Sequence, residues 1–132
     1  MAPRLPKALG KTWTEAFVRL GYGDIFGFPT RSLHWKTQDS NPVDVADIIE
    51  PIDYNEFEGA MVAHTLRQWG SEGIVSSVEF GREYSPVLYI RMHRDAPEGA
   101  RDALMEVLRS PHMLKADEVD VETGGVVRAW WD

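Results

Sequence analysis

The chain of 132 residues contains no cysteine, which excludes disulfide bonds, a thiol nucleophile and cysteine-ligated zinc. It also has no run close to the roughly 18 apolar residues that a membrane-spanning helix requires. Residues 1–7 carry charge but no apolar segment of the kind found in a signal peptide. Together these absences predict a cytoplasmic protein that has no membrane partner.

Motifs typical of enzymes are also scarce. No GxSxG or HExxH pattern occurs, and the glycines of segment 21–27 lack the Lys-Ser/Thr pair of a phosphate-binding loop. The histidines match no zinc-ligand spacing: His34, His64, His93 and His112. We therefore predict no catalytic residue, no metal and no cofactor. A pocket formed by Tyr84, Arg91 and His93 is the alternative, as in a small enzyme or ligand-binding domain.

The charge of the chain is acidic and unevenly placed. Acidic residues outnumber basic ones by 21 to 14, which gives a net charge of −7 at pH 7. This balance repels a phosphate backbone, so we expect no direct nucleic-acid partner. Residues 1–36 hold six basic and two acidic residues, a net +4, which leaves −11 for residues 37–132. The chain therefore joins a basic N-terminal part to an acidic body.

We interpret residues 1–132 as a single domain with three parts. Residues 1–11 contain two prolines and three cations without periodicity, and they form an arm. Residues 12–41 begin with a short helix and continue as a long loop rich in glycine and aromatic residues. Residues 42–132 show the helix caps and hydrophobic periodicities of a folded core.

Two helices are predicted in the first part of the core. Asn41 followed by proline favours a helix over 42–50. A strand over 43–49 is the alternative, because that segment is rich in β-branched residues. Asp53 begins a capping-box pattern that predicts a longer helix over 54–69.

Alternating apolar residues and turn signals predict four strands and one more helix. The strands span 74–80, 87–93, 117–122 and 126–131, and the helix spans 97–109. Gly124 and Gly125 are typical of a two-residue hairpin turn between the last two strands. The order helix–strand–strand thus occurs twice, and the pattern Glu-Gly-Ala-x-x-Ala at 58–63 and 98–103 leaves an internal duplication open.

This order predicts an α+β fold, a two-layer sandwich whose four-stranded, mainly antiparallel sheet carries the helices on one face. The core order is αββαββ, preceded by the basic arm and the short helix. With a strand over 43–49, the order would instead approach a ferredoxin-like fold. The predicted core residues are Phe57, Met61, Leu66, Trp69, Ile74, Val78, Phe80, Leu88, Ile90, Leu104, Val107, Leu108, Val119, Val121 and Trp130.

The last hairpin carries the most specific interaction pattern. With a two-residue turn, paired positions sum to 249, so Val119 lies opposite Trp130 and Glu118 lies opposite Trp131. The outward face then holds Glu118, Asp120 and Glu122 beside Val127, Ala129 and Trp131, with no cation opposite the carboxylates. Burying three unpaired carboxylates is prohibitively costly, so this face is expected to meet solvent or a cationic partner.

These features favour a non-catalytic protein–protein interaction or assembly subunit, such as a small virion or tail component of a phage particle. An acidic inhibitor that mimics nucleic acid at a basic target site is the alternative, as in an antidefence protein. The expected partner is another copy of the chain or another subunit of an assembly, reached by the basic arm. The predicted partner-binding residues are Arg4, Lys7, Lys11, Glu118, Asp120, Glu122 and Trp131.

Overall fold

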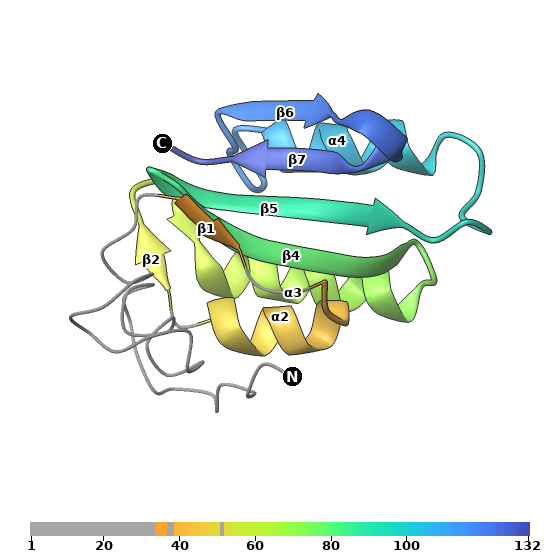
Figure 1. The fold of residues 1–132 in the computed structure, drawn as a ribbon, viewed down its shortest axis with the longest axis horizontal. Helices are drawn as coiled ribbons and strands as arrows, with labels where there is room; N and C mark the ends of the chain where they lie inside the picture. Colours follow the sequence, from red (N-terminus) through yellow and green to blue (C-terminus); the bar gives the residue numbers. More distant parts are fainter. Residues whose placement is uncertain (1–33, 37–38, 51) are drawn as a thin grey trace.

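The computed structural model describes residues 34–36, 39–50 and 52–132, which form a sheet with helices against it (Figure 1). The five strands are antiparallel in the order β1-β4-β5-β7-β6. They are β1 (His34–Lys36), β4 (Val75–Glu83), β5 (Ser85–Met92), β6 (Glu118–Val121) and β7 (Val127–Trp130). The helices are α2 (Pro42–Ile49), α3 (Gly59–Ser71) and α4 (Ala100–Arg109), and β2 (Asp53–Tyr54) pairs with β3 (Phe57–Glu58) in a separate two-stranded sheet.

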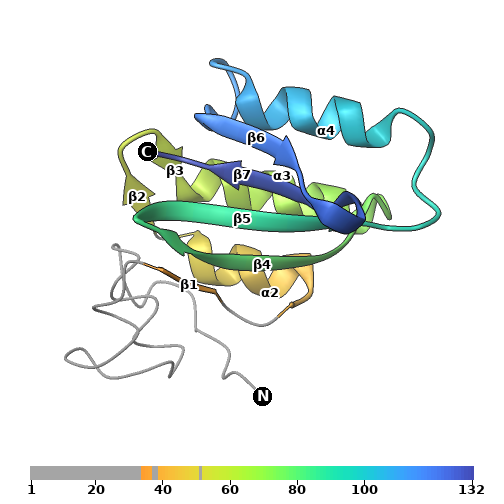
Figure 2. The same cartoon turned by 45° about the horizontal axis from the view of Figure 1, so that its top comes forward.

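The helices lie on one face of the sheet (Figure 2), so the predicted α+β two-layer class is confirmed. Residues 42–49 are helical, and the Asn41 side chain caps them by accepting a hydrogen bond from the Val43 N–H at 2.8 Å. The strand alternative for this segment is therefore wrong. The ferredoxin-like order required that strand, so it is not supported. β1 extends the predicted four-stranded sheet by one short edge strand.

The long helix predicted over 54–69 begins five residues later than expected, at Gly59, and ends at Ser71. The preceding residues form the β2–β3 hairpin, in which Asn55 adopts a positive φ of 51°. Asp53 therefore does not cap the helix. The tight packing at Gly59 explains the late start, because a Cβ there would lie only 2.1 Å from the Ile49 carbonyl oxygen. The chain can pass this point closely only as glycine.

The last hairpin has a register one residue away from the predicted one. Val119 pairs with Ala129, and Asp120 pairs with Arg128, so paired positions sum to 248. The turn is a three-residue 3₁₀ segment over Thr123–Gly125, in which both glycines have a positive φ. Because side chains alternate across a strand, this single shift moves every side chain of β7 to the opposite face.

The register shift exchanges the two neighbouring tryptophans. Trp131 is completely buried, its indole N–H donates to the Leu114 carbonyl at 2.6 Å, and its ring meets Phe57 edge-on at 4.9 Å. Trp130 is only half-buried and lies on the other side of the sheet. The predicted core position of Trp130 and the predicted exposure of Trp131 are both wrong.

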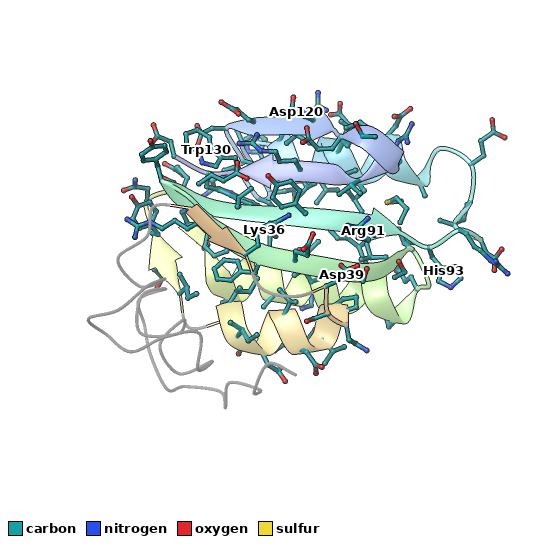
Figure 3. The ribbon with its side chains drawn as sticks, in the orientation of Figure 1. Lys36, Asp39, Arg91, His93, Asp120 and Trp130 are labelled. Carbon is teal, nitrogen blue, oxygen red and sulfur yellow. The ribbon has the colours of Figure 1, made fainter. Side chains whose placement is uncertain are left out.

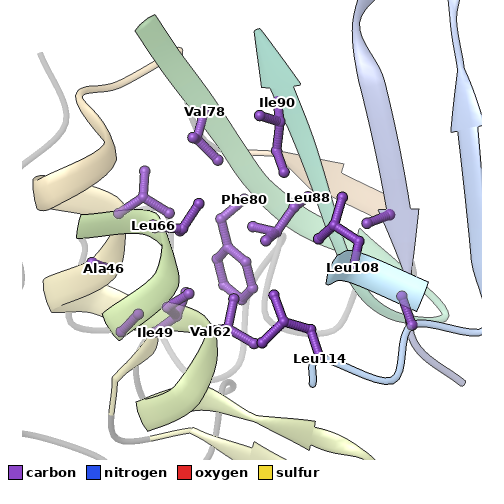
Figure 4. Packing of buried hydrophobic residues seen from close by; sticks show 14 of the residues in the cluster. Ala46, Ile49, Val62, Leu66, Val78, Phe80, Leu88, Ile90, Leu108 and Leu114 are labelled. Atoms are coloured by element: carbon purple, nitrogen blue, oxygen red, sulfur yellow. The ribbon is translucent and has the colours of Figure 1, made fainter. Parts of the chain in front are cut away.

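The centre of the core matches the sequence prediction (Figure 4), with the Phe80 ring lying among side chains from both layers. The confirmed buried residues are Phe57, Leu66, Trp69, Val78, Phe80, Leu88, Ile90, Leu104 and Leu108. Met61 and Val121 are wrong, being 38% and 44% exposed. Those buried only in part are Ile74, Val107 and Val119. A β-bulge between Val75 and Ser77 explains why Ile74 is only partly buried, because the bulge changes which residues of β4 point inward.

Replacing Ile90 with alanine is expected to destabilise the fold by about 2–5 kcal/mol, because it leaves a cavity at a completely buried position. Val121→Ala is the matched control on an exposed strand position and should cost less than about 0.5 kcal/mol. Urea unfolding of both variants measures the difference. A loss below about 1 kcal/mol for Ile90→Ala would show that β5 is assigned the wrong face.

Candidate interaction surface

The face of the sheet opposite the helices is lined by charged and aromatic side chains (Figure 3). We call this set the outer sheet face: Lys36, Asp39, Glu79, Glu83, Tyr89, Arg91, Glu118, Asp120, Arg128 and Trp130. No helix in the described part of the chain covers it. With three cations and five carboxylates, the face keeps an acidic excess. The same face also carries two partly exposed aromatic rings, those of Tyr89 and Trp130.

Arg128 organises one half of this face. Its guanidinium lies 2.7 Å from a Glu83 oxygen, 3.0 Å from Glu118 and 3.3 Å from Asp120. Only 16% of the side chain is exposed. Burial acts to lower the pKa of Arg128, but the hydrogen bonds to Glu83 and Glu118 outweigh it and raise that pKa. The carboxylate row of β6 therefore has a cation opposite it, and the prediction that it has none is wrong.

Tyr89 extends the same cluster toward the centre of the sheet. Its hydroxyl donates to Glu83, whose other oxygen accepts from the Arg128 guanidinium. Burial, followed by the hydrogen bond to Glu83, raises the pKa of Tyr89 to about 12. The ammonium of Lys36 lies 4.6 Å above the tyrosine ring, a cation–π contact. Tyr89 is therefore held in place from both its edge and its face.

The other half of the outer sheet face is organised by Arg91 on β5. Its guanidinium contacts Asp39 at 2.8 Å and Glu79 at 3.6 Å. Glu79 also lies 3.6 Å from Lys36, which joins this half to Tyr89. Cross-strand charge pairs of this kind set side-chain orientation more than they add stability, because solvent screens them.

Trp130 lies at the edge of the Arg128 cluster. Its indole N–H donates to the Glu83 carbonyl at 2.8 Å, so the ring is fixed while part of it stays accessible. Trp131 was the predicted anchor for a partner, but its complete burial removes it from any surface. The tryptophan that lies on the face with the carboxylates is Trp130.

The structure brings together some of the predicted partner-binding residues. Glu118 and Asp120 lie on the outer sheet face, each with 55% of the side chain exposed. Glu122 is exposed at the start of the turn, where its backbone N–H donates to the Val126 carbonyl. The predicted arm residues lie outside the described residues: Arg4, Lys7 and Lys11.

Sequence reasoning missed Arg128, Trp130, Glu83 and Tyr89 as members of this surface. The signal that could have found Arg128 and Trp130 is the alternation of β7 counted from a three-residue turn instead of a two-residue one. The strand predicted over 74–80 stops short of Glu83, but β4 continues as far as Glu83 before the chain reverses at Tyr84.

The alternative pocket of Tyr84, Arg91 and His93 does not form. Tyr84 precedes β5 and His93 follows it, so the length of an eight-residue strand separates them. Within the described ranges, no group of three or more histidine, aspartate or glutamate residues is placed to hold a metal ion. No helix in those ranges combines the length and apolarity needed to cross a membrane.

The chain was also compared with known proteins. No family model, curated protein or solved structure matches it.

The raised pKa of Tyr89 predicts a specific alkaline titration. In the folded state the pKa is about 12 against 10.0 in a free side chain, so the protonated form stabilises the fold. That contribution is fully present below pH 10 and is lost as the pH rises from 10 to about 12. Ultraviolet difference titration of the wild type against Tyr89→Phe isolates this group. Glu83→Gln should move the titration back toward 10, and an unchanged midpoint would contradict the assigned hydrogen bond.

Proposed function

We propose that this chain is a non-catalytic protein-binding or assembly subunit that uses the outer sheet face to hold a cationic segment of another protein. The observation that carries the proposal is the acidic outer sheet face, which contains Trp130 and Tyr89 and which no helix of the described residues covers. Interface centres are enriched in tryptophan, tyrosine and arginine, which is the composition found around Arg128.

A second copy of the chain is the partner that the charge distribution favours. Residues 1–36 carry a net +4, and residues 37–132 carry −11. The basic residues Arg4, Lys7 and Lys11 of one copy would contact Glu118, Asp120 and Glu122 of the next. Repeated head to tail, such a contact closes a ring or extends a filament. A small virion or tail component of a phage particle would be one example of such an assembly subunit.

The affinity of such an interface would come mainly from its aromatic residues. Each exposed ion pair is worth roughly 0–1 kcal/mol, so the arm steers and orients the contact. Trp130, already held by its indole hydrogen bond, offers a rigid ring that loses little entropy on binding.

The nucleic-acid mimic has less support from the same surface. A mimic of a phosphate backbone needs a continuous row of uncompensated negative charges. Here Arg128 is paired with both β6 carboxylates, Glu118 and Asp120, that the mimic would use. The paired arrangement is better suited to a protein partner than to a site built for phosphates.

Reversing one charge on the outer sheet face tests the proposal. Asp120→Lys should weaken association of the full chain, because it adds repulsion toward a cationic partner and toward Arg128. Glu106→Lys is the matched control, since Glu106 is exposed on α4 in the helix layer and the charge change is identical. Native mass spectrometry or light scattering over a range of salt concentrations gives the result. Equal weakening by both variants, or a monomer at low salt and high concentration, would contradict self-assembly through this face.

Deleting residues 1–11 provides the complementary test. The truncated chain should associate less than the full chain, because it has lost Arg4, Lys7 and Lys11. Its thermal unfolding should change little, because residues 42–132 carry the predicted caps and periodicities of the core. A large drop in the melting temperature would show that the arm belongs to the fold of its own copy. Unchanged association would remove the arm from the interface.

A further inference from the structure

A cleft of about 580 Å³ lies where β5 ends, next to the outer sheet face, and Arg91 of that face is part of its lining. Its walls are the loop that follows β5, the beginning of α4 and the 123–125 turn. Figure 3 shows His93 at this end of the sheet. The volume is within the usual range of small-molecule sites, about 300–1,000 Å³.

Three arginines line this cleft, and of these Arg91 is paired with Asp39 and Glu79. Arg94 and Arg101 line the cleft, are exposed, and form no ion pair with any other residue that the structure describes. In contrast, Arg67 contacts two carboxylates and Arg128 contacts three. The cleft therefore carries two cations without an ion pair among the described residues, with Asp102 in the lining and the Asp95 carboxylate 3.9 Å from His93 as nearby negative charges.

The position of Arg101 relates directly to the glycine turn. Its Nη1 atom lies 3.5 Å from where a Cβ would stand on Gly125, so the guanidinium reaches across the cleft from α4 to the turn. Gly125 has a φ of 79° and Gly124 a φ of 82°, values that a residue with a side chain rarely adopts. At this point the turn presents only its backbone to the guanidinium.

His93 adds a donor to the same wall. Its Nδ1 accepts a hydrogen bond from the Asp95 N–H at 3.1 Å, which places the proton of the neutral ring on Nε2. α4 also begins beside the cleft, and the positive end of its dipole favours an anion. Asp102 is the acidic residue of the lining and opposes this effect.

We propose that this cleft binds a phosphoryl group, through the guanidinium groups of Arg94 and Arg101 with His93 as a further donor. A phosphate dianion matches two guanidinium forks in charge and in bidentate geometry. The cleft is larger than a phosphate ion, and Met92, Pro97 and Val126 supply an apolar wall for an organic substituent. The preferred ligand is therefore a small phosphate monoester. The three proposed phosphoryl ligands are not part of the outer sheet face, although Arg91 of that face also lines the cleft.

Calorimetric titration of the full chain at low salt with inorganic phosphate, adenosine monophosphate and adenosine tests the proposal. Both phosphate compounds should bind and adenosine should not. Tighter binding of the monophosphate would identify an ester as the ligand class, and equal affinity would identify free phosphate. No binding of either phosphate compound at millimolar concentration would overturn the proposal.

Single substitutions then locate the site. Arg94→Gln and Arg101→Gln should each weaken phosphate binding about tenfold, the effect of losing one charge-assisted hydrogen bond. Arg109→Gln is the matched control, because Arg109 lies at the far end of α4, where its Nε donates to the Met105 carbonyl at 3.4 Å. Asp102→Asn should tighten binding. If Arg109→Gln and Arg101→Gln weakened phosphate binding equally, the net charge of the protein would explain the effect, and the proposed site would be wrong.

Discussion

Two consecutive glycines with positive φ determine which side of the sheet each residue of β7 occupies. Because the turn has three residues, Val127, Ala129 and Trp131 point into the core, while Arg128 and Trp130 point outward. A one-residue change would bury a guanidinium and expose an indole, at a cost of several kcal/mol for the unpaired charge alone. The core and the outer sheet face therefore depend on the same register.

The two faces of the sheet are stabilised by different physics. On the helix side, Phe57, Phe80 and Trp131 form a chain of aromatic contacts that closes the core around the β2–β3 hairpin. On the outer side, the largely buried Arg128 and Glu83 side chains form charge-assisted hydrogen bonds with each other. Their burial limits the competition of water for the same donors and acceptors. The first face supplies most of the stability, and the second supplies a rigid, defined chemical surface.

The proposed protein-binding face and the proposed phosphoryl cleft meet at β5. Arg91 on the outer sheet face is engaged by Asp39 and Glu79, whereas Arg94, three residues on, has no such partner among the described residues. The end of the strand thus separates arginines that organise the surface from arginines available to a ligand. The two proposals share no binding residue, so either can fail without the other.

The sequence alone was sufficient for the α+β class, the four main strands β4 to β7, the Asn41 cap and most of the central core, because caps and periodicity are local signals. The start of α3, the bulge in β4 and the register of the last hairpin could not be predicted from neighbouring residues in the sequence. The start of α3 depends on how closely the Gly59 backbone approaches the Ile49 carbonyl, a contact between separate elements. The register depends on which glycine conformations the turn adopts, and both hairpin lengths suit the same residues. The carboxylates Glu118 and Asp120 were therefore predictable as surface residues, but their pairing with Arg128 was decided by tertiary structure, because only strand pairing brings the three side chains to one face.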